Sequence, residues 1–472
     1  MADVDLLVVG AGAGGLAAAR EGVRVGRRTV LVTEGPPGGD CTFTGCVPSK
    51  TLLAAAARGE PAAIALAQVR ATVARVAATE TATVLRGEGV EVREGRARFV
   101  AARAVEVAGL RLTARSTVLA CGSSPRPAAL SGLDTVAEDS VLTTDTVFSL
   151  DDAPPSMVVV GGGPVGCELA QAFARLGTAV TLVEAAQGLL PGEDPDVGAV
   201  LATVLSRDGV DVRVGAGATA VAPGPRGVRV STADGGRLDA ARLLMAIGRR
   251  PAVDDLGLDA AGVARTASGA VAVDAHLRTT AEGVWAAGDV TGLCPHTHAA
   301  DEMGRLAAAN ATRRRSRRFE PGLVPRVVFT DPEVATIGLG EAAAAGRGPA
   351  WVAEVAMSEV DRAVTAGRED GFVRLVAAAP RGTRRLTRGG LGPVGGGRPL
   401  GATIVADRAG EMIAEIALVM RIGALTGRLA QTVHAYPTWT LAVRQAAARL
   451  ALSGGGARRA RAVPPFPEEE TR

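Results

Sequence analysis

Lysine and tyrosine are almost absent from this chain of 472 residues. The only lysine is Lys50 and the only tyrosine is Tyr436, so arginine carries nearly all of the positive charge. The formal net charge of +3 is too small to require a nucleic-acid partner, and we expect none. In a composition this depleted the positions of the two remaining residues are informative, although a single residue can also fall anywhere by chance.

Cysteine is scarce as well, with five residues in the whole chain. A sparse, odd number argues against the disulfide framework of a small secreted domain and favours reactive or incidental thiols. Apolar runs of about 18 residues without charge or glycine are missing, which argues against a membrane span. The first residues show no basic leader and no cleavage site, so we expect a cytoplasmic protein.

A strand, a glycine-rich loop and a helix occur twice in the sequence, each time followed by a strand that ends in glutamate. Glycines allow the backbone to approach a pyrophosphate at the helix N-terminus, and the acid accepts a hydrogen bond from a ribose hydroxyl. The alternative is a pair of tight turns in an ordinary α/β sheet, which two complete copies disfavour. The predicted binding residues are Gly10, Gly12, Gly15 and Glu34 in the first copy, and Gly161, Gly163, Gly166 and Glu184 in the second.

The glutamate of the second copy also predicts which nicotinamide dinucleotide binds there. A carboxylate at Glu184 repels a 2′-phosphate, and neither Ala185 nor Ala186 is the arginine that would accept one. We therefore expect NADH to be preferred to NADPH.

The strongest chemical signal lies between Gly38 and Lys50, where Cys41 and Cys46 are separated by four residues. This gap is wider than that of zinc knuckles and thioredoxin-like motifs, so we expect no metal site. It suits a disulfide across the opening of a helix, with Pro48 in the first turn. A thiolate near a helix N-terminus and beside a cation has a lowered pKa, and Lys50 is that cation. We therefore predict a redox-active pair, with two buried structural cysteines as the alternative.

This segment resembles the redox-disulfide motif of the pyridine nucleotide-disulfide oxidoreductases, which include dihydrolipoamide dehydrogenase, glutathione reductase and mercuric reductase. The resemblance extends over nearly the whole chain. Four further segments carry it: Ala120-Cys121-Gly122, Ala246-Ile247-Gly248-Arg249-Arg250-Pro251, Ala287-Gly288-Asp289 and Phe329-Thr330-Asp331-Pro332-Glu333.

The resemblance implies an α/β fold with two Rossmann-like dinucleotide-binding domains and an α+β C-terminal dimerisation domain. The expected ranges are an FAD-binding domain at 1–150, an NAD(P)-binding domain at 151–275, a return to the FAD-binding domain at 276–322 and a dimerisation domain at 323–452. Residues 453–472 are rich in glycine, proline and charge and are predicted to be a disordered tail. The family also implies a homodimer.

The same resemblance implies roles for individual residues. NADH binds over the Gly161 loop and passes a hydride to FAD, and the reduced flavin attacks a Cys41–Cys46 disulfide. Cys46 then becomes the thiolate in charge-transfer contact with the flavin, and Cys41 becomes the interchange thiol that meets the substrate. Lys50 lies near the flavin and pairs with Glu168. The other expected cofactor contacts are Gly39, Gly122, Gly248 and Asp289.

The C-terminal segment His434-Ala435-Tyr436-Pro437-Thr438-Trp439-Thr440-Leu441 differs from that of the disulfide-reducing members. Those enzymes have a histidine at the position of Tyr436, which carries the proton of the interchange thiol, and an orienting glutamate at the position of Leu441. Tyrosine, with a pKa of about 10 against about 6.5 for histidine, is a poor base at neutral pH. His434 lies two residues earlier and is either a displaced base or a packing residue.

These features favour an enzyme that passes electrons from NADH through FAD, Cys41 and Cys46 to a small-molecule acceptor. Because the usual proton relay is missing, we expect a quinone, a metal ion or a small oxidant rather than a disulfide. One alternative is a disulfide reductase similar to dihydrolipoamide dehydrogenase, with His434 as the base. The other is a flavin-binding redox sensor that does not turn over.

Overall fold

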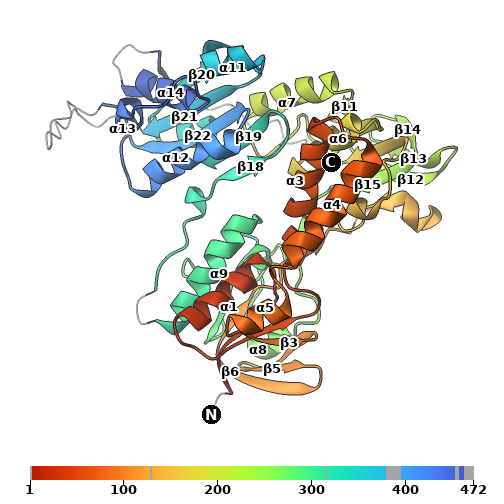
Figure 1. Ribbon diagram of the computed structural model, residues 1–472, viewed down its shortest axis with the longest axis vertical. Coiled ribbons are helices and arrows are strands. Elements are labelled where there is room, and N and C mark those ends of the chain that lie inside the picture. The colour runs from red at the N-terminus through yellow and green to blue at the C-terminus, as the bar shows by residue number, and fades with distance from the viewer. Residues whose placement is uncertain (1–2, 128–129, 314–315, 379–394, 452–455, 462–472) are drawn as a thin grey trace. The chain divides into compact units, whose positions relative to one another are not determined.

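The computed structural model describes residues 3–127, 130–313, 316–378, 395–451 and 456–461, and it divides the chain into two compact units (Figure 1). The first unit comprises Met1–Ala129, Val141–Pro154 and Ile247–Pro321. The second comprises Leu130–Ser140, Pro155–Ala246 and Gly322–Arg472. Each unit therefore contains segments that are distant in sequence.

The first unit is built on a seven-stranded sheet with the order β3-β2-β1-β6-β5-β4 and with β17 added beside β6. Strands β3, β2, β1, β6 and β17 pair with one another in parallel, whereas β5 pairs with both β6 and β4 in antiparallel fashion. The central strands are apolar on both faces because helices cover them, as expected of a parallel sheet. The strands are β1 (Val4–Val9), β2 (Thr29–Thr33), β3 (Glu91–Glu94), β4 (Ala97–Ala101), β5 (Ala104–Val107), β6 (Leu110–Leu119) and β17 (Val284–Ala286).

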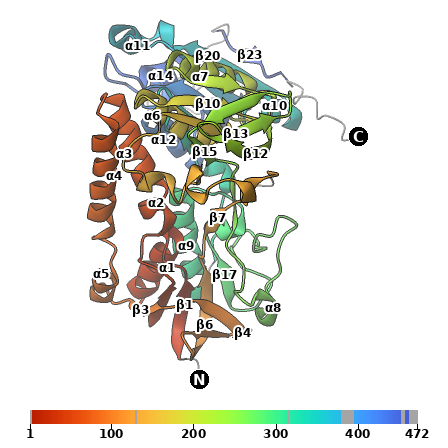
Figure 2. The same cartoon turned by 90° about the vertical axis from the view of Figure 1, so that its right-hand side faces the viewer.

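Two helices of this unit, α1 (Ala13–Arg24) and α9 (Thr297–Thr312), lie side by side in both views (Figures 1 and 2). Their close approach depends on glycine: a Cβ at Gly304 would lie 2.0 Å from the Gly14 carbonyl oxygen. This contact joins the first turn of α1 to the middle of α9, and α1 begins after β1, at the end of the parallel strands where ligands bind in such sheets. The remaining helices are α2 (Gly39–Phe43), α3 (Cys46–Ala57), α4 (Ala62–Ala77), α5 (Ala82–Gly87) and α8 (Leu258–Ala261).

The second unit begins with a smaller parallel sheet in which β11, β10, β9 and β15 follow one another. A three-stranded antiparallel sheet of β12, β13 and β14 accompanies it. The elements are β9 (Ser156–Val160), α6 (Pro164–Arg175), β10 (Ala179–Val183), α7 (Pro195–Arg207), β11 (Asp211–Arg213), β12 (Ala218–Gly224), β13 (Gly227–Thr232), β14 (Arg237–Ala240) and β15 (Arg242–Met245).

The C-terminal part of the second unit is an antiparallel sheet of six strands in the order β18-β19-β22-β21-β20-β23. Helix α12 lies against β19 and β22 (Figure 1), and the helices α12 and α14 share one apolar core with the sheet. The strands are β18 (Arg326–Val328), β19 (Glu333–Gly338), β20 (Ala350–Ala356), β21 (Phe372–Ala378), β22 (Pro399–Ala406) and β23 (Arg458–Arg459). The helices are α10 (Glu341–Arg347), α11 (Asp361–Ala366), α12 (Ala409–Arg421), α13 (Thr426–Gln431) and α14 (Leu441–Ala451).

The predicted fold class is confirmed, but two predicted boundaries need correction. The chain returns to the first unit at Ile247 rather than at 276, because β16 (Arg249–Pro251) pairs with β7 (Ser123–Pro125). Residues 130–140, predicted to belong to the first domain, are part of the second unit, where Ser131 pairs with Ala220.

The predicted disordered tail was also wrong in part. Residues Arg458 and Arg459 form β23, which pairs with Trp351 and Val352 at the edge of the sheet. The Arg458 guanidinium binds the Glu341 carboxylate, which explains why a polar segment is held there. Residues 453–455 and 462–472 of this tail lie outside the described part of the chain. Within the described part, no helix is long and apolar enough to cross a membrane.

Candidate active site

The first glycine loop forms a tight cradle at the start of α1. A Cβ at Gly15 would lie 1.8 Å from the Gly10 carbonyl oxygen, and one at Gly10 would lie 2.3 Å from the Ala120 carbonyl oxygen. Gly12 is the N-cap of α1, no side chain caps this terminus, and its first turn contains no acid. The helix therefore directs backbone N–H groups and the positive end of its dipole outward, as a pyrophosphate requires.

A second close approach brings the cysteine segment to this cradle. Gly39 has a φ of +63°, and a Cβ there would lie 2.7 Å from the Gly12 Cα atom. Only glycine allows both the left-handed backbone and the short distance. The predicted cofactor residues Gly12 and Gly39 are thus brought together by the fold.

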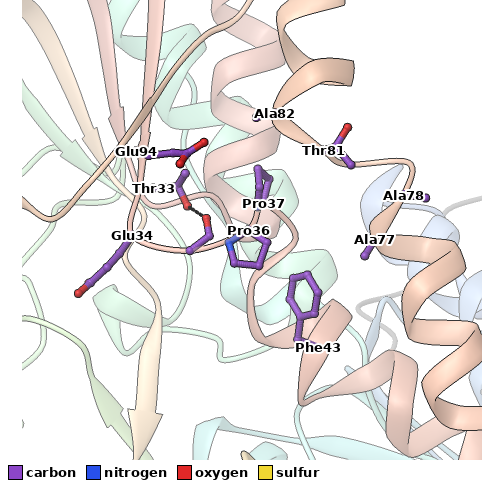
Figure 3. Close-up of a pocket in the computed structure, with 11 residues that line it drawn as sticks. Thr33, Glu34, Pro36, Pro37, Phe43, Ala77, Ala78, Thr81, Ala82 and Glu94 are labelled. Atoms are coloured by element: carbon purple, nitrogen blue, oxygen red, sulfur yellow. Dashed lines mark hydrogen bonds between the residues drawn. The ribbon is translucent and has the colours of Figure 1, made fainter.

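Glu34 follows β2 and is one of the residues that line a cavity of about 560 Å³ within the first unit. Figure 3 shows Pro36, Pro37 and Phe43 on one side of this cavity and Ala77 and Thr81 on the other. A largely apolar cavity of this size beside a carboxylate suits the adenosine end of a dinucleotide. The cradle, the open helix terminus and this cavity together fit FAD.

The second glycine loop repeats the geometry of the first. A Cβ at Gly166 would lie 1.8 Å from the Gly161 carbonyl oxygen. Gly163 is the N-cap residue of α6, and no side chain caps this helix terminus. The Glu184 carboxylate accepts hydrogen bonds from the backbone N–H groups of Gly162, at 2.6 Å, and Ala186, at 2.7 Å. The predicted nucleotide residues therefore come together in the second unit, with a fixed negative charge at the end of β10.

The two candidate redox cysteines lie on consecutive short helices, Cys41 within α2 and Cys46 as the first residue of α3. Both are thiols in this structure, Cys46 exposed and Cys41 half-buried. The hydrogen bond to Cys46, burial and the neighbouring sulfur raise the pKa of Cys41 well above its usual range. Cys41 is therefore the sulfur that keeps a proton, which favours Cys46 as the thiolate at the helix N-terminus.

Thr297 is a site residue that the sequence analysis missed. Its hydroxyl oxygen lies 3.3 Å from the Cys46 sulfur, and its hydrogen bond opposes the rise in the Cys41 pKa. It is the first residue of α9, which begins shortly after Asp289. The only sequence signal was a hydroxyl residue at a helix start, which many helices have.

Asp289 is held by a polar network within the first unit. Its carboxylate accepts a hydrogen bond of 2.8 Å from the Ser123 hydroxyl, to which the Arg249 Nε atom also donates at 2.8 Å. Arg249 also binds the Asp40 carboxylate next to Cys41. Burial raises the pKa of Asp40, against the opposing charge of Arg249. Sequence reasoning placed Asp289 at the flavin but did not identify Ser123 or Arg249 as its supports.

The glycines Gly122 and Gly248 flank this network. They have φ values of +73° and +95°, and they adjoin the paired strands β7 and β16. Both predicted cofactor glycines therefore lie in the same part of the first unit as Asp289.

Lys50 lies in α3 of the first unit, and Glu168 lies in α6 of the second. Glu168 is buried, with 4% of its surface exposed, and its carboxylate accepts a 2.8 Å hydrogen bond from the Phe329 N–H group. This bond ties α6 to the segment that opens the C-terminal part of the second unit. The expected pairing of Lys50 with Glu168 remains a prediction.

The C-terminal segment has an exposed tyrosine and a buried histidine. Tyr436 is 72% exposed and donates a 2.8 Å hydrogen bond to the Asp361 carboxylate, which raises the pKa of the phenol. The His434 side chain is 6% exposed, and its Nε2 atom lies 3.0 Å from the Glu415 carboxylate. Leu441 is buried at the start of α14, so this position provides packing and no carboxylate.

Two of the other cysteines, Cys121 and Cys167, have thiol pKa values raised by burial. Burial raises the pKa of Cys121 to about 12, and burial also raises the pKa of Cys167 far above its usual range. The Cys167 sulfur donates to the Gly162 carbonyl oxygen. Among the described residues, no group of three or more His, Cys, Asp or Glu side chains could hold a metal ion.

Two dinucleotide cradles, an acid behind each, and a dithiol at a helix N-terminus beside the first cradle define a flavin- and nicotinamide-dependent dithiol oxidoreductase. The profile described as pyridine nucleotide-disulphide oxidoreductase matches residues 4–304, and that of the family's dimerisation domain matches residues 324–386 and 395–447. The chain belongs to the pyridine nucleotide-disulfide oxidoreductase family.

Three relatives show the range of this similarity. Dihydrolipoyl dehydrogenase from Thermus scotoductus is 34% identical over 95% of this chain and 98% of its own. Mercuric reductase from Streptomyces lividans is 33% identical over 94% of this chain and 95% of its own. The structure of a Cu(II) complex of the HOCl-induced flavoprotein disulfide reductase RclA from Escherichia coli covers 95% of this chain and 99% of its own, with 25% identity and a TM-score of 0.82.

Family membership confirms the enzyme class, the dependence on FAD and a pyridine nucleotide, and the dimerisation domain of a homodimer.

Proposed function

We propose that this enzyme passes electrons from NADH through FAD and the Cys41–Cys46 pair to a quinone, a metal ion or a small oxidant. The observation that carries the proposal is the C-terminal segment, which has Tyr436 at the expected position of the base and Leu441 at that of the orienting carboxylate, while its imidazole, His434, binds Glu415 of α12. Because Asp361 raises the pKa of Tyr436, an even smaller fraction of this phenol is ionised at neutral pH than in an ordinary tyrosine, so less of it is available to accept a proton.

The chemistry of the acceptor explains why this substitution matters. Reduction of a disulfide by a dithiol releases a thiol, and an imidazole held by a carboxylate supplies its proton efficiently. Electron transfer to a metal ion or an oxidant releases no such thiol. A metal ion or a small oxidant can therefore be reduced without the histidine–carboxylate pair that delivers a proton to a released thiol.

The residues of the first unit carry the electron pair to the acceptor. FAD held by the Gly10–Gly15 loop, Gly39 and Asp289 would supply the redox chemistry that links a nicotinamide hydride to the disulfide. Cys46 holds the resulting thiolate at the N-terminus of α3, where the helix dipole favours negative charge. Cys41 keeps its proton because it is hydrogen-bonded to Cys46, and it is the thiol that contacts the acceptor. Lys50 supplies a compact positive charge near the flavin.

The nucleotide preference follows from the fixed charge at Glu184. Its carboxylate is held by two backbone N–H groups, so it cannot easily turn away from a nucleotide on the Gly161 loop. A ribose 2′-hydroxyl can donate to this carboxylate, whereas a 2′-phosphate is repelled. This supports NADH as the preferred reductant.

Within the proposed acceptor class, the relatives give most support to metal ions. One relative is named mercuric reductase, and one related structure is described as a Cu(II) complex. The second candidate function is reduction of a lipoamide-type disulfide, because other relatives are named dihydrolipoyl dehydrogenase. A buried His434 does not favour that candidate, since both ring nitrogens already bind protein groups.

The test is an anaerobic titration of the FAD-loaded enzyme with NADH, followed by turnover with a panel of acceptors. A long-wavelength charge-transfer band is expected on reduction, and it would place the cysteines on the electron path. Turnover with Cu(II), Hg(II) or a benzoquinone should then exceed turnover with lipoamide and glutathione disulfide by at least about 100-fold in kcat/KM. Comparable turnover with lipoamide would refute the proposed acceptor class, and a band without turnover of any acceptor would support a sensor.

A further inference from the structure

The helix that carries Cys41 is too short to fix its own position. Helix α2 has only five residues, and isolated helices of this length are unstable because few backbone bonds offset the loss of conformational freedom. Contacts with the rest of the first unit must therefore hold it. The Gly38 N–H group donates to the Ala11 carbonyl oxygen at 2.8 Å, and the Thr42 hydroxyl donates to the Glu80 carboxylate at 3.1 Å.

A third contact comes from Asp40, the residue directly before Cys41. Its carboxylate binds the Arg249 guanidinium. The backbone of Asp40 also supports the turn between the two cysteines, because its carbonyl oxygen accepts from the Thr44 N–H group at 2.9 Å. A Cβ at Gly45 would lie 2.8 Å from the same oxygen. A displacement of Asp40 would therefore move the turn that separates the two thiols.

Arg249 is itself held by a second set of hydrogen bonds. Its Nε atom donates to the Ser123 hydroxyl and its Nη2 atom to the Ser123 carbonyl oxygen, each at 2.8 Å. Its Nη1 atom donates to the Thr144 hydroxyl at 3.2 Å. The Ser123 hydroxyl in turn donates to Asp289 at 2.8 Å. One arginine therefore joins the helix of Cys41 to the segment that carries Asp289.

The fixed position of Arg249 makes its ion pair with Asp40 stronger than an ordinary surface pair. The Asp40 side chain is 55% exposed, and an isolated pair at such a site stabilises little, because two long side chains must be ordered and water screens the charges. The Arg249 side chain is only 26% exposed and is already ordered by Ser123 and Thr144. Binding Asp40 therefore costs little further conformational entropy. The hydrogen bond is also charge-assisted, and such bonds are stronger than neutral ones.

The stability of a disulfide depends on how well its two thiols are positioned. A disulfide requires the sulfur atoms at one separation and orientation, whereas two thiols tolerate many. The Cys41 thiol is already hydrogen-bonded to Cys46. Holding α2 in this position raises the effective concentration of Cys41 at Cys46 and so favours the disulfide over the dithiol. Release of α2 should favour the dithiol and raise the reduction potential of the pair.

We propose that Asp40, held by Arg249, is a positioning residue that keeps Cys41 against Cys46 and thereby lowers the reduction potential of the cysteine pair. Its carboxylate acts on the thiols through helix α2, so it is not a catalytic residue. The inference rests on the redox role that the proposed function gives to the two cysteines, but it does not depend on the acceptor.

The test is the equilibrium of the FAD-loaded full-length enzyme with mixtures of reduced and oxidised dithiothreitol under anaerobic conditions. The two enzyme thiols give two electrons and two protons to the oxidised reagent, which becomes the dithiol while the Cys41–Cys46 disulfide forms. Alkylation and mass spectrometry of the peptide with both cysteines give the dithiol fraction. Asp40→Ala should lower the equilibrium constant for disulfide formation by about tenfold, the scale of one charge-assisted hydrogen bond at a partly exposed site. This change corresponds to a rise of about 30 mV in the reduction potential.

Matched variants separate positioning from charge. Asp40→Asn keeps an oxygen that can accept from Arg249, so it should change the constant much less than Asp40→Ala. Asp145→Asn removes a carboxylate that lies 3.9 Å from the Arg249 Nη1 atom but is outside α2, and it should leave the constant unchanged. An equal change in Asp145→Asn would mean that charge rather than position sets the potential, and it would overturn the proposal.

A double-mutant cycle tests whether the two residues act through their contact. Arg249→Met should lower the constant at least as much as Asp40→Ala, and adding Asp40→Ala to Arg249→Met should lower it no further. The FAD content of each variant is measured, and Asp40→Ala should retain FAD because Ser123 still holds Arg249. Losses that add in the double variant, or an unchanged constant in Asp40→Ala, would overturn the proposal.

An anaerobic NADH titration of the wild type and Asp40→Ala separates this inference from the proposed function. Both should show the charge-transfer band, because Cys46 lies at the start of α3 and not on α2. Absence of the band in the wild type would refute the electron path of the proposed function, while the dithiothreitol equilibrium would still decide the role of Asp40. A band in the wild type with the same equilibrium constant in Asp40→Ala would refute the positioning role alone.

Discussion

The cysteine segment at 41–50 and the C-terminal segment at 432–440 contrast sharply. In the first, both thiols, the helix N-terminus and the only lysine stand together as the chemistry of the family requires. In the second, a tyrosine occupies the position of the base, and the nearest imidazole is buried against α12. Under the proposed function, electrons enter through a dithiol but leave without the release of a thiol. The acceptor, rather than the reductant, would then distinguish this enzyme from the disulfide-reducing members of its family.

The largest expected effect tests the first half of this contrast. Cys46→Ser should abolish the charge-transfer band on reduction and lower kcat for the acceptor by about 1,000-fold or more, because it removes the sulfur that takes up the electron pair. The measurement is an anaerobic NADH titration together with steady-state turnover. Cys167→Ser, which replaces a buried thiol that donates to the Gly162 carbonyl oxygen in the second unit, is the control and should retain both properties. An unchanged band in Cys46→Ser would show that the cysteines are off the electron path.

The second half of the contrast can be tested by rebuilding the missing relay. Tyr436→His alone should give little gain with lipoamide, since Leu441 offers no carboxylate to orient the new ring. Tyr436→His combined with Leu441→Glu should raise kcat/KM for lipoamide by about 100-fold, the lower range of general acid–base catalysis. Because Leu441 is buried, the double variant must first be shown to fold and bind FAD. Robust lipoamide turnover in the single variant would contradict this account of the lost relay.

How much of this could be predicted depends on the distance along the chain between interacting residues. The glycine loops and the cysteine segment were predictable because their geometry arises from residues close in sequence. The partners of the C-terminal segment were not, since Glu415 and Asp361 lie 19 and 75 residues from the side chains that they bind. The return to the first unit at Ile247 was missed for the same reason, because it depends on pairing between β16 and β7.

A third prediction concerns the choice of reductant. Glu184→Gln removes the charge and keeps one carbonyl oxygen, which can accept from the N–H group of Gly162 or of Ala186 but not replace both carboxylate oxygens. It should raise the ratio of kcat/KM for NADPH to that for NADH by about tenfold, as expected for loss of one charge repulsion near the protein surface. Rapid-mixing measurements of flavin reduction by each nucleotide would give this ratio without involving the acceptor. An equal decrease with both nucleotides would mean that Glu184 only supports the loop.

The smallest expected effect concerns the pKa of Tyr436. Asp361 accepts a hydrogen bond from the Tyr436 hydroxyl, and its negative charge would repel the phenolate. Both effects raise the pKa of Tyr436. Asp361→Asn should therefore lower that pKa toward the ordinary value of about 10. Because Tyr436 is the only tyrosine in the chain, the rise of phenolate absorbance with pH reports this one residue, and Tyr436→Phe provides the blank. Turnover with the preferred acceptor at neutral pH should hardly change, since the phenol stays protonated in either case. A large gain in lipoamide turnover in Asp361→Asn would instead show that Tyr436 can act as the base and that Asp361 prevents it by raising its pKa. The C-terminal segment would then have kept a proton relay of adjusted pKa rather than lost the relay.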